Sequence, residues 1–457
     1  MVTFMRARWF RKTEGPEYRL PFIEGIRGLA ALYVVLGHIC SMSDPRAFQN
    51  FTSNAPAWLQ QIMTPLWDGH LAVAAFIVVS GFCLQMSLFP GKDGRIHRLG
   101  EYLKRRARRM LPAYYACLVL SLVICFTVTN RLPGMPFEQY LPVTWQNGLA
   151  HLFLIQNWSP TWMYKINGVL WSIAIEAQLY LLFPILVWLM FKTGRVAVTV
   201  LTAMAAAAIL FGRPIWQAVS TGSVGLADAA RNAQADPAAL KLYPWYLALF
   251  AFGMVAAYMA FRPSLKFGVK PKLALLLAAA CGLGAIQAVR TIQPIYVSDA
   301  LMAGAVALIL YSGLTRPGHW FMRALGCKPL AWLGLFSYSL YLIHHPVEQV
   351  LYYYRPAWAN GEVGVFGYLA ACLPAMILVA WVFWWFFERP FLRRPALYQS
   401  NLVQVPTRLP RAISTPTVPS GPVGRRGQMA PEALLEGAIE AAPGESETTP
   451  IEVHPLL

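Results

Sequence analysis

The chain has 457 residues, of which 57% are hydrophobic and only 13% are charged, and its mean hydropathy is +0.46. A soluble domain carries roughly 25% charged residues, so this composition excludes an ordinary soluble enzyme. Apolar runs long enough to cross a bilayer recur along the chain, and they predict an all-α, polytopic membrane protein. The net charge of +17 does not indicate nucleic-acid binding, because the basic residues fall mainly between the apolar runs, where they report topology.

The first apolar run, about residues 22–41, contains Glu24, Arg27 and His38. Ionisable groups at membrane depth are costly and are therefore candidates for function. About three helical turns separate Arg27 from His38, so both lie on one helix face, roughly 16 Å apart along the axis. We expect Arg27 near one membrane surface and His38, a titratable base, deep in the span. The alternative is a snorkelling arginine and a histidine that serves helix packing.

About ten spans are predicted in all, and an even number places both termini on one side of the membrane. The segments that would face the cytoplasm hold 25 Lys and Arg residues and those that would face outside hold 8. This bias predicts cytoplasmic termini. Within 130–168, the apolar stretch 148–156 is too short to span and is predicted to be re-entrant or interfacial. The later spans are predicted at about 67–89, 110–129, 169–191, 196–212, 242–261, 273–289, 298–314, 329–348 and 363–387.

This pattern divides the chain into three parts. Residues 1–20 form a basic N-terminal segment that we expect in the cytoplasm, and 21–395 form the transmembrane domain. Residues 396–457 are rich in Pro, Ser, Thr, Gly and Glu and are predicted to be a disordered cytoplasmic tail. The seven cysteines are scattered and odd in number, so they indicate neither a disulfide framework nor a metal site.

Four arginines, Arg105, Arg106, Arg108 and Arg109, lie within five positions at the predicted cytoplasmic mouth of the third span. Arg105 pairs with Arg108, and Arg106 with Arg109, at a spacing that puts each pair on one helix face. Arginine forks bind phosphate in a bidentate manner, so the cluster suits a polyphosphate such as the nucleotide end of coenzyme A. The alternative is a positive-inside anchor that touches anionic lipid.

The span at 169–191 places Ser172, Glu176 and Tyr180 on one stripe. Glu176 is the one acid in that run, and a buried carboxyl needs a partner or a proton. It could orient His38 or pair with Arg27, and the alternative is a structural interhelical hydrogen bond.

The span at 329–348 places Ser337, Tyr341 and His344 or His345 along one side, with Tyr338 on the neighbouring stripe. These polar groups could line one cavity together with the polar residues of the other spans. Alternatively, they could be core residues whose hydrogen bonds are satisfied within the protein. In the second span, Ser80 and Gly81 are small residues at mid-membrane, which we interpret first as packing and second as cavity lining. Motifs of zinc proteases, P-loop NTPases and serine hydrolases are absent from the sequence.

Six motifs along residues 18–395 resemble the acyltransferase 3 family of integral membrane acyltransferases. In the family's order they are Arg27 and His38 in EGIRGLAALYVVLGHI, FIVVSGF, the Arg105–Arg109 cluster before Pro112 and Tyr114, LWSIAIEAQLY, SYSLYLIHHP and Glu388-Arg389-Pro390. Members O-acylate polysaccharides, peptidoglycan, lipopolysaccharide and small molecules such as macrolides. The resemblance implies that His38 is catalytic and that Arg27 and the clustered arginines hold the acyl donor. Some members carry a fused extracytoplasmic hydrolase-like domain, which we do not expect here.

We therefore predict an O-acyltransferase that takes an acyl group, expected to be acetyl, from cytoplasmic acyl-coenzyme A. His38 would act as general base on the acceptor hydroxyl or accept the acyl group itself, and Glu176 would fix its tautomer or stabilise its charged form. The clustered arginines would hold the donor phosphates, and Arg27 would guide the donor. The other predicted cavity-lining residues are Ser80, Ser172, Tyr180, Tyr341, His344 and His345.

The expected partners are acyl-coenzyme A as a co-substrate, a glycan or glycolipid acceptor, and the lipid bilayer, with no nucleic acid, metal or bound cofactor. The expected location is a bacterial inner membrane. The alternative function is a transporter or lipid-linked flippase whose polar midplane residues form a substrate path. The two functions differ in that an acyltransferase consumes acyl-coenzyme A in detergent without a gradient, whereas a transporter does not.

Overall fold

Every regular element that the structure describes is helical, which confirms the all-α part of the predicted fold class. The structure, a computed structural model, describes residues 20–43, 56–66, 69–88, 96, 98–131, 140–194, 244–261, 270–291 and 295–392. All of these residues belong to the unit Met1–Val403. The predicted N-terminal segment except Leu20, the predicted span 196–212 and the predicted tail 396–457 lie outside the described residues.

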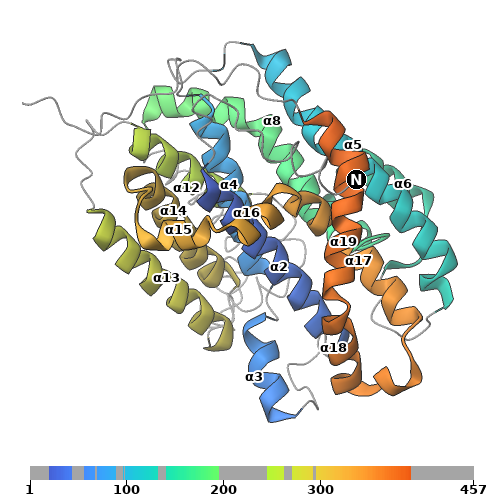
Figure 1. Cartoon of the computed structure of the whole chain (residues 1–457). Coiled ribbons are helices and arrows are strands. Elements are labelled where there is room, and N and C mark those ends of the chain that lie inside the picture. Colours follow the sequence, from blue (N-terminus) through green and yellow to red (C-terminus); the bar gives the residue numbers. More distant parts are fainter. Residues whose placement is uncertain are drawn as a thin grey trace, which may run out of the picture. The chain divides into compact units, whose positions relative to one another are not determined.

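Figure 1 shows the described helices, coloured from blue to red along the sequence. They are α2 (Pro21–Ser43), α3 (Ala57–Leu66), α4 (His70–Met86), α5 (Leu99–Thr127), α6 (Trp145–Leu152), α7 (Pro160–Met163), α8 (Leu170–Thr193), α12 (Pro244–Phe261), α13 (Pro271–Thr291), α14 (Ile295–Thr315), α15 (Trp320–Leu325), α16 (Lys328–Leu335), α17 (Ser337–Tyr353), α18 (Gly361–Ala371) and α19 (Leu373–Phe383). Short 3-10 turns join several of them, and a single π-helical turn, Trp384–Glu388, follows α19.

Five of the described helices are long and apolar enough to cross a membrane, and a bent pair, Gly361–Ala371 with Leu373–Phe391, makes a sixth. The helices α4 and α12 are apolar but shorter. The chain therefore has the helices of an integral membrane protein, while the count of about ten spans and the cytoplasmic termini stay predictions. The predicted re-entrant or interfacial stretch, 148–156, overlaps the short helix α6, and Trp145 at the start of α6 and Phe153 just after it are exposed.

Two predicted spans are not single helices. The span expected at 329–348 is divided at Phe336 into α16 and α17, and α17 then continues through Pro346 to Tyr353. The span expected at 363–387 is bent by 45° at Cys372. Pro374 lies in the first turn of α19 and has no N–H to bond the preceding turn, which accounts for the bend.

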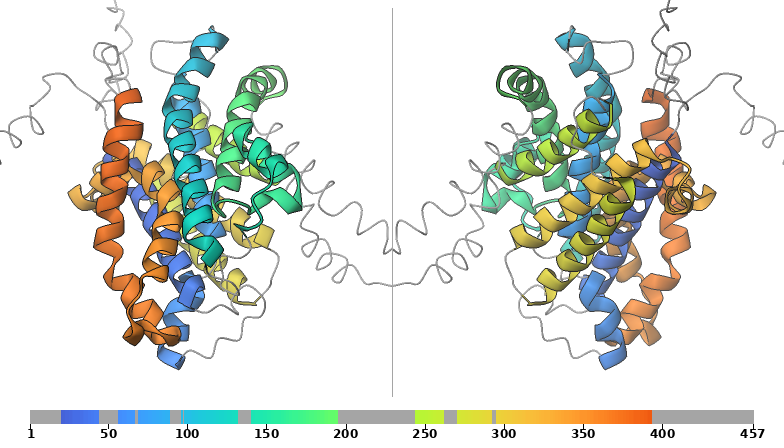
Figure 2. Two further views of the ribbon diagram at one scale, coloured as in Figure 1. Left: turned by 90° about the vertical axis from the view of Figure 1, so that its right-hand side faces the viewer. Right: turned by 90° about the vertical axis from the view of Figure 1, so that its left-hand side faces the viewer.

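The helix α2 lies at the centre of the described helices and contacts α4, α16, α17 and α18 (Figure 2). Glycines allow two of the close helix contacts around the site. A Cβ atom on Gly81 of α4 would overlap the carbonyl oxygen of Phe250 on α12, and one on Gly334 of α16 would overlap that of Glu24 on α2. These contacts hold α2 and α4 in register with their neighbours, and both helices carry residues of the cavity described next.

Candidate active site

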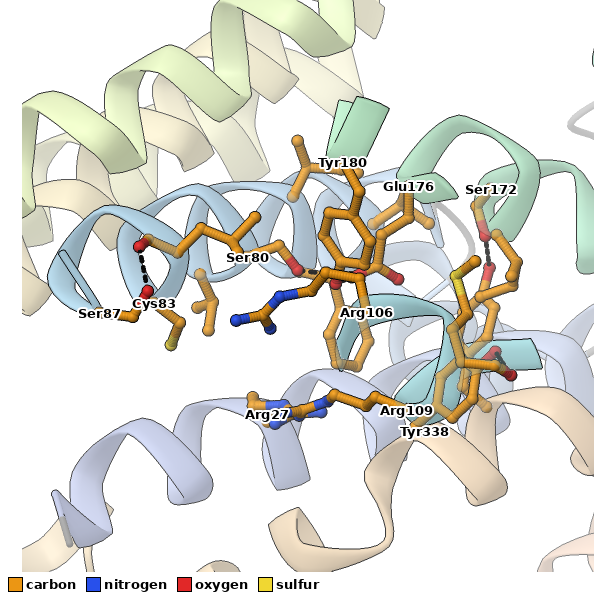
Figure 3. A pocket seen from close by; sticks show the side chains of 18 of the residues that line it. Arg27, Ser80, Cys83, Ser87, Arg106, Arg109, Ser172, Glu176, Tyr180 and Tyr338 are labelled. Atoms are coloured by element: carbon orange, nitrogen blue, oxygen red, sulfur yellow. Dashed lines mark hydrogen bonds between the residues drawn. The ribbon is translucent and has the colours of Figure 1, made fainter. Parts of the chain in front are cut away.

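Five helices, α2, α4, α5, α8 and α17, surround a cavity of about 320 Å³ (Figure 3). That volume lies at the lower end of the usual range for small-molecule sites. One wall is apolar, and the polar groups converge from helices far apart in the sequence. The polar lining residues are Glu24, Arg27, Ser80, Cys83, Ser87, Arg106, Arg109, Ser172, Glu176, Tyr180, Tyr338 and Tyr341.

Three arginines from two helices point into the cavity (Figure 3). Arg27 of α2 lies 3.8 Å from the carboxylate of Glu24, and 18% of its side chain is exposed. Arg106 of α5 lies over the rings of Tyr102 and Tyr180, 5.8 and 5.9 Å from their centroids. The Nε atom of Arg106 makes no hydrogen bond to any described residue. The site thus holds buried positive charge with donors left for an anion.

The other two arginines of the cluster face away from the cavity. Arg105 is exposed and forms an ion pair of 3.7 Å with Glu101, and Arg108 is also exposed. The sequence placed each pair on one helix face but could not say which pair faced inwards. The structure brings Arg106 and Arg109 to the cavity, and it leaves Arg105 and Arg108 on the outer face of α5.

The carboxylate of Glu176 accepts two hydrogen bonds within the cavity. One comes from Ser80 Oγ on α4 at 2.6 Å, and the other comes from the hydroxyl of Tyr180, one turn along α8. Among the described residues, no hydrogen bond or ion pair joins Glu176 to His38 or Arg27. The acid therefore ties α4 to α8 and holds the Tyr180 ring beside Arg106.

Ser172 and Tyr341 line another part of the cavity and belong to different helices, α8 and α17. Their hydroxyl groups share a hydrogen bond of 2.6 Å, and each hydroxyl also lies within hydrogen-bond distance of the carbonyl oxygen of Val169. The Tyr341 ring packs against Phe76 on the cavity side, and its centroid lies 5.9 Å from that of His344. Tyr341 thus stands between the cavity and the histidines.

A cluster of three imidazoles lies behind Tyr341 and does not line the cavity. His38 of α2 has its ring centroid 5.0 Å from that of His344 and 4.6 Å from that of His345. His345 Nε2 also lies 2.8 Å from the hydroxyl of Tyr140. Two consecutive residues of α17 therefore flank the histidine of α2.

Carbonyl acceptors indicate which ring nitrogen carries the proton in His344 and in His38. His344 Nδ1 is 3.2 Å from the carbonyl oxygen of Leu340, and a carbonyl can only accept, so Nδ1 carries the proton. In neutral His344, Nε2 is then an acceptor. His38 Nδ1 lies 3.1 Å from that atom and 3.0 Å from the carbonyl oxygen of Val34, so His38 Nδ1 is the donor. His38 Nε2 keeps its lone pair, and it makes no hydrogen bond to the described residues.

This arrangement separates the predicted site residues into two groups. The residues around the cavity are Arg27, Ser80, Arg106, Arg109, Ser172, Glu176, Tyr180 and Tyr341. The cluster behind it consists of His38, His344 and His345. The structure thus places the two histidines of α17 beside the histidine of α2, not on the cavity wall.

Sequence reasoning missed several polar residues. Cys83 lines the cavity one turn beyond Ser80, and Glu348 lies fully buried one turn beyond His345. The helical spacing of three residues was a signal for both. Tyr140 has no such signal, because it reaches His345 across 205 positions of the chain.

Comparison with known proteins gives one family and several relatives. The model of a family described as an acyltransferase domain, Acyl_transf_3, matches residues 20–385. O-acetyltransferase OatA of Staphylococcus aureus (strain NCTC 8325 / PS 47) is 24% identical over 417 residues, covering 85% of this chain and 60% of OatA. Acyltransferase MdmB of Streptomyces mycarofaciens is 27% identical over 358 residues, covering 76% of this chain and 82% of MdmB.

A third relative is a putative peptidoglycan O-acetyltransferase, YrhL of Bacillus subtilis (strain 168). It is 22% identical over 357 residues, which cover 74% of this chain and 50% of YrhL. The chain thus spans about 60% of the length of OatA and half that of YrhL.

Proposed function

Because the chain belongs to the acyltransferase 3 family of acyltransferase domains, we propose that it is a membrane O-acyltransferase. It moves an acyl group from acyl-coenzyme A, a co-substrate and not a bound cofactor, to a hydroxyl group. The observation that carries the proposal is that Arg27, Arg106 and Arg109 surround a cavity whose Tyr341 wall abuts the His344–His38 pair.

The arginine-lined cavity suits the phosphate-bearing donor. Guanidinium groups form charge-assisted hydrogen bonds with phosphate oxygens, and a site of low dielectric strengthens them. With Arg106 and Arg109 bound to phosphate, the extended pantetheine arm would run along the apolar wall toward Tyr341. His38 does not line the cavity. The thioester must therefore move past the Tyr341 ring to reach His38 and react.

His38 Nε2 is the base in this mechanism. It takes the proton of the acceptor hydroxyl as that oxygen attacks the thioester carbon, the new C–O bond replaces the C–S bond, and the departing thiolate receives the proton. The products are the acylated acceptor and free coenzyme A, and His38 returns to its neutral form. In the covalent variant, Nε2 itself attacks the thioester first and then passes the acyl group to the acceptor.

The names of the relatives support a short acyl group and a glycan acceptor. OatA and YrhL are named as O-acetyltransferases, and YrhL as one putatively acting on peptidoglycan. For this chain we propose acetyl-coenzyme A as the donor and a glycan or glycolipid handled at the bacterial cytoplasmic membrane as the acceptor. The proposed orientation puts the arginine cluster on the cytoplasmic side, where coenzyme A is available.

The test is consumption of acyl-coenzyme A by the purified protein in detergent, where no gradient exists. We expect release of free thiol from acetyl-coenzyme A, increased by an added glycan acceptor. Release should fall when His38 is replaced. A well-folded protein that binds coenzyme A but never releases thiol, with or without acceptor, would contradict the proposal and favour a transporter.

A further inference from the structure

The acid Glu348 of α17 is fully buried. Its side chain is 0% exposed, and neither carboxyl oxygen has a hydrogen-bond partner among the described residues. An unsatisfied polar group in a protein interior is rare and calls for an explanation. A carboxyl in such a place is costly as a charge and still costly as an unpaired neutral group. The buried carboxyl of Glu348 therefore lowers the stability of the fold.

The surroundings of Glu348 suggest why it is kept. Its Oε2 atom lies 4.0 Å from Nδ1 of His345, one turn away on α17. The other ring nitrogen of His345 meets the hydroxyl of Tyr140, and its ring lies 4.6 Å from that of His38. On the facing helix α2, Cys40 is close enough to interact electrostatically with Glu348. Glu348 is thus the carboxyl of the histidine cluster.

We propose that Glu348 is a positioning residue for His38, acting through His345. The inference rests on the proposed function, in which His38 becomes an imidazolium for part of each cycle. A positive charge that forms inside a membrane span needs a counter-charge. Glu176 hydrogen-bonds Ser80 and Tyr180 in the cavity, whereas Glu348 lies on the far side of the imidazoles. It orients His345 against His38 and supplies the negative charge that the reaction requires.

The chemistry of this role needs no other reactant. His345 stays neutral throughout the cycle, with Nε2 accepting from the Tyr140 hydroxyl and the proton on Nδ1, which lies 4.0 Å from Glu348 Oε2. When His38 takes the acceptor proton, the neutral His345 ring lies between the new positive charge and the Glu348 carboxylate, so no second imidazolium forms beside His38. The proton on His38 then leaves with the coenzyme A thiol, so the cluster ends the cycle as it began.

The test compares stability with turnover in three variants of the full chain. Glu348→Met replaces an unpaired buried acid by an apolar side chain of similar length, so Tm should rise. If Glu348 positions His38, kcat should nevertheless fall about tenfold or more, with the KM for acetyl-coenzyme A unchanged. Glu348→Gln should lower kcat similarly, and Glu348→Asp should restore part of it. Glu362→Gln in the first turn of α18 is the control and should leave kcat unchanged.

Each outcome decides between this role and a structural one. Normal kcat in folded Glu348→Met or Glu348→Gln protein would overturn the inference while the proposed function stands. A fall in kcat that only follows a fall in Tm would also overturn it, because a purely structural residue behaves in that way. If the wild-type protein consumes no acetyl-coenzyme A at all, the proposed function fails and this inference fails with it.

Discussion

The Nδ1 atom of His38 lies 3.1 Å from Nε2 of His344, although 306 positions of sequence separate the two residues. The contact joins α2, near the start of the chain, to α17, near its end. Because Leu340 fixes the proton of His344 on the other nitrogen, His344 accepts from His38 and leaves His38 Nε2 as the free base. A side chain that sets the tautomer of a catalytic histidine commonly contributes much of its activity.

Replacing His344 tests this orientation directly. His344→Phe removes the side-chain acceptor on α17 and leaves only the Val34 carbonyl oxygen for His38 Nδ1. The His38 ring then loses its hydrogen bond to α17, and kcat should fall by roughly tenfold or more, with little change in coenzyme A binding, because the cavity arginines are untouched. His344→Gln offers a carbonyl oxygen to His38 Nδ1 and should retain more activity than the Phe variant. Steady-state kinetics on both proteins give the answer, and equal activity in the two variants would show that the acceptor atom is unimportant.

Replacing His38 tests the base itself. Asn is polar and similar in size but cannot cycle a proton near neutral pH, so His38→Asn should fold, bind coenzyme A and lose acyl transfer by roughly 10²-fold or more. Turnover per folded molecule is the measurement, with folding checked by the size-exclusion profile. If the well-folded Asn protein turns over like the wild type, His38 is a packing residue and the mechanism is wrong.

The two arginine pairs of α5 provide a matched comparison. Arg106→Ala with Arg109→Ala removes cations that line the cavity, and coenzyme A binding should weaken by roughly 1.5–3 kcal/mol for each arginine that bonds phosphate directly. Arg105→Ala with Arg108→Ala removes the same charge from the exposed face of the same helix and should change affinity little. Titration of both double variants with coenzyme A is decisive. Equal weakening in the two variants would indicate long-range attraction or a lipid anchor, not a binding site.

The glycine contact between α4 and α12 makes a prediction about stability. A methyl group on Gly81 would overlap the backbone of Phe250, whereas one on Gly367 of α18 would meet no atom within 4 Å. Gly81→Ala should therefore destabilise the protein by roughly 1–3 kcal/mol. Gly367→Ala should be neutral or stabilise it by about 0.5–1 kcal/mol. Thermal unfolding in detergent measures both, and equal Tm values for the two variants would mean that the helices separate at little cost.

Orientation in the membrane is tested by labelling. The excess of basic residues on one side predicts that a cysteine placed in 213–241 reacts with an impermeant reagent from outside, while one in 263–270 does not. A variant without the native cysteines provides the background. The reverse pattern would move the arginine cluster away from the cytoplasm, and with it the proposed donor site.

The sequence by itself determined which segments are apolar helices and which residues share a helix face. Arg106 lies beside Arg109, and Tyr180 beside Glu176, because helical periodicity is a local property of the chain. The family motifs likewise selected residues that the structure divides between the cavity and the histidine cluster behind it, while Arg105 and Arg108 face outwards. The predicted helix ends were less accurate than the predicted helices. The break at Phe336, for example, depends on how α16 and α17 pack and not on local preference.

Only the tertiary structure decided which faces meet. The rotation of α5 about its axis, which turns Arg106 inwards and Arg105 outwards, is set by its neighbours. The same holds for the partners of buried polar groups. The sequence left open whether Glu176 pairs with Arg27 or orients His38. In the structure it accepts a hydrogen bond from Ser80 instead. Contacts between distant helices carry no local signature, because they depend on how packing satisfies each buried polar group at the lowest cost.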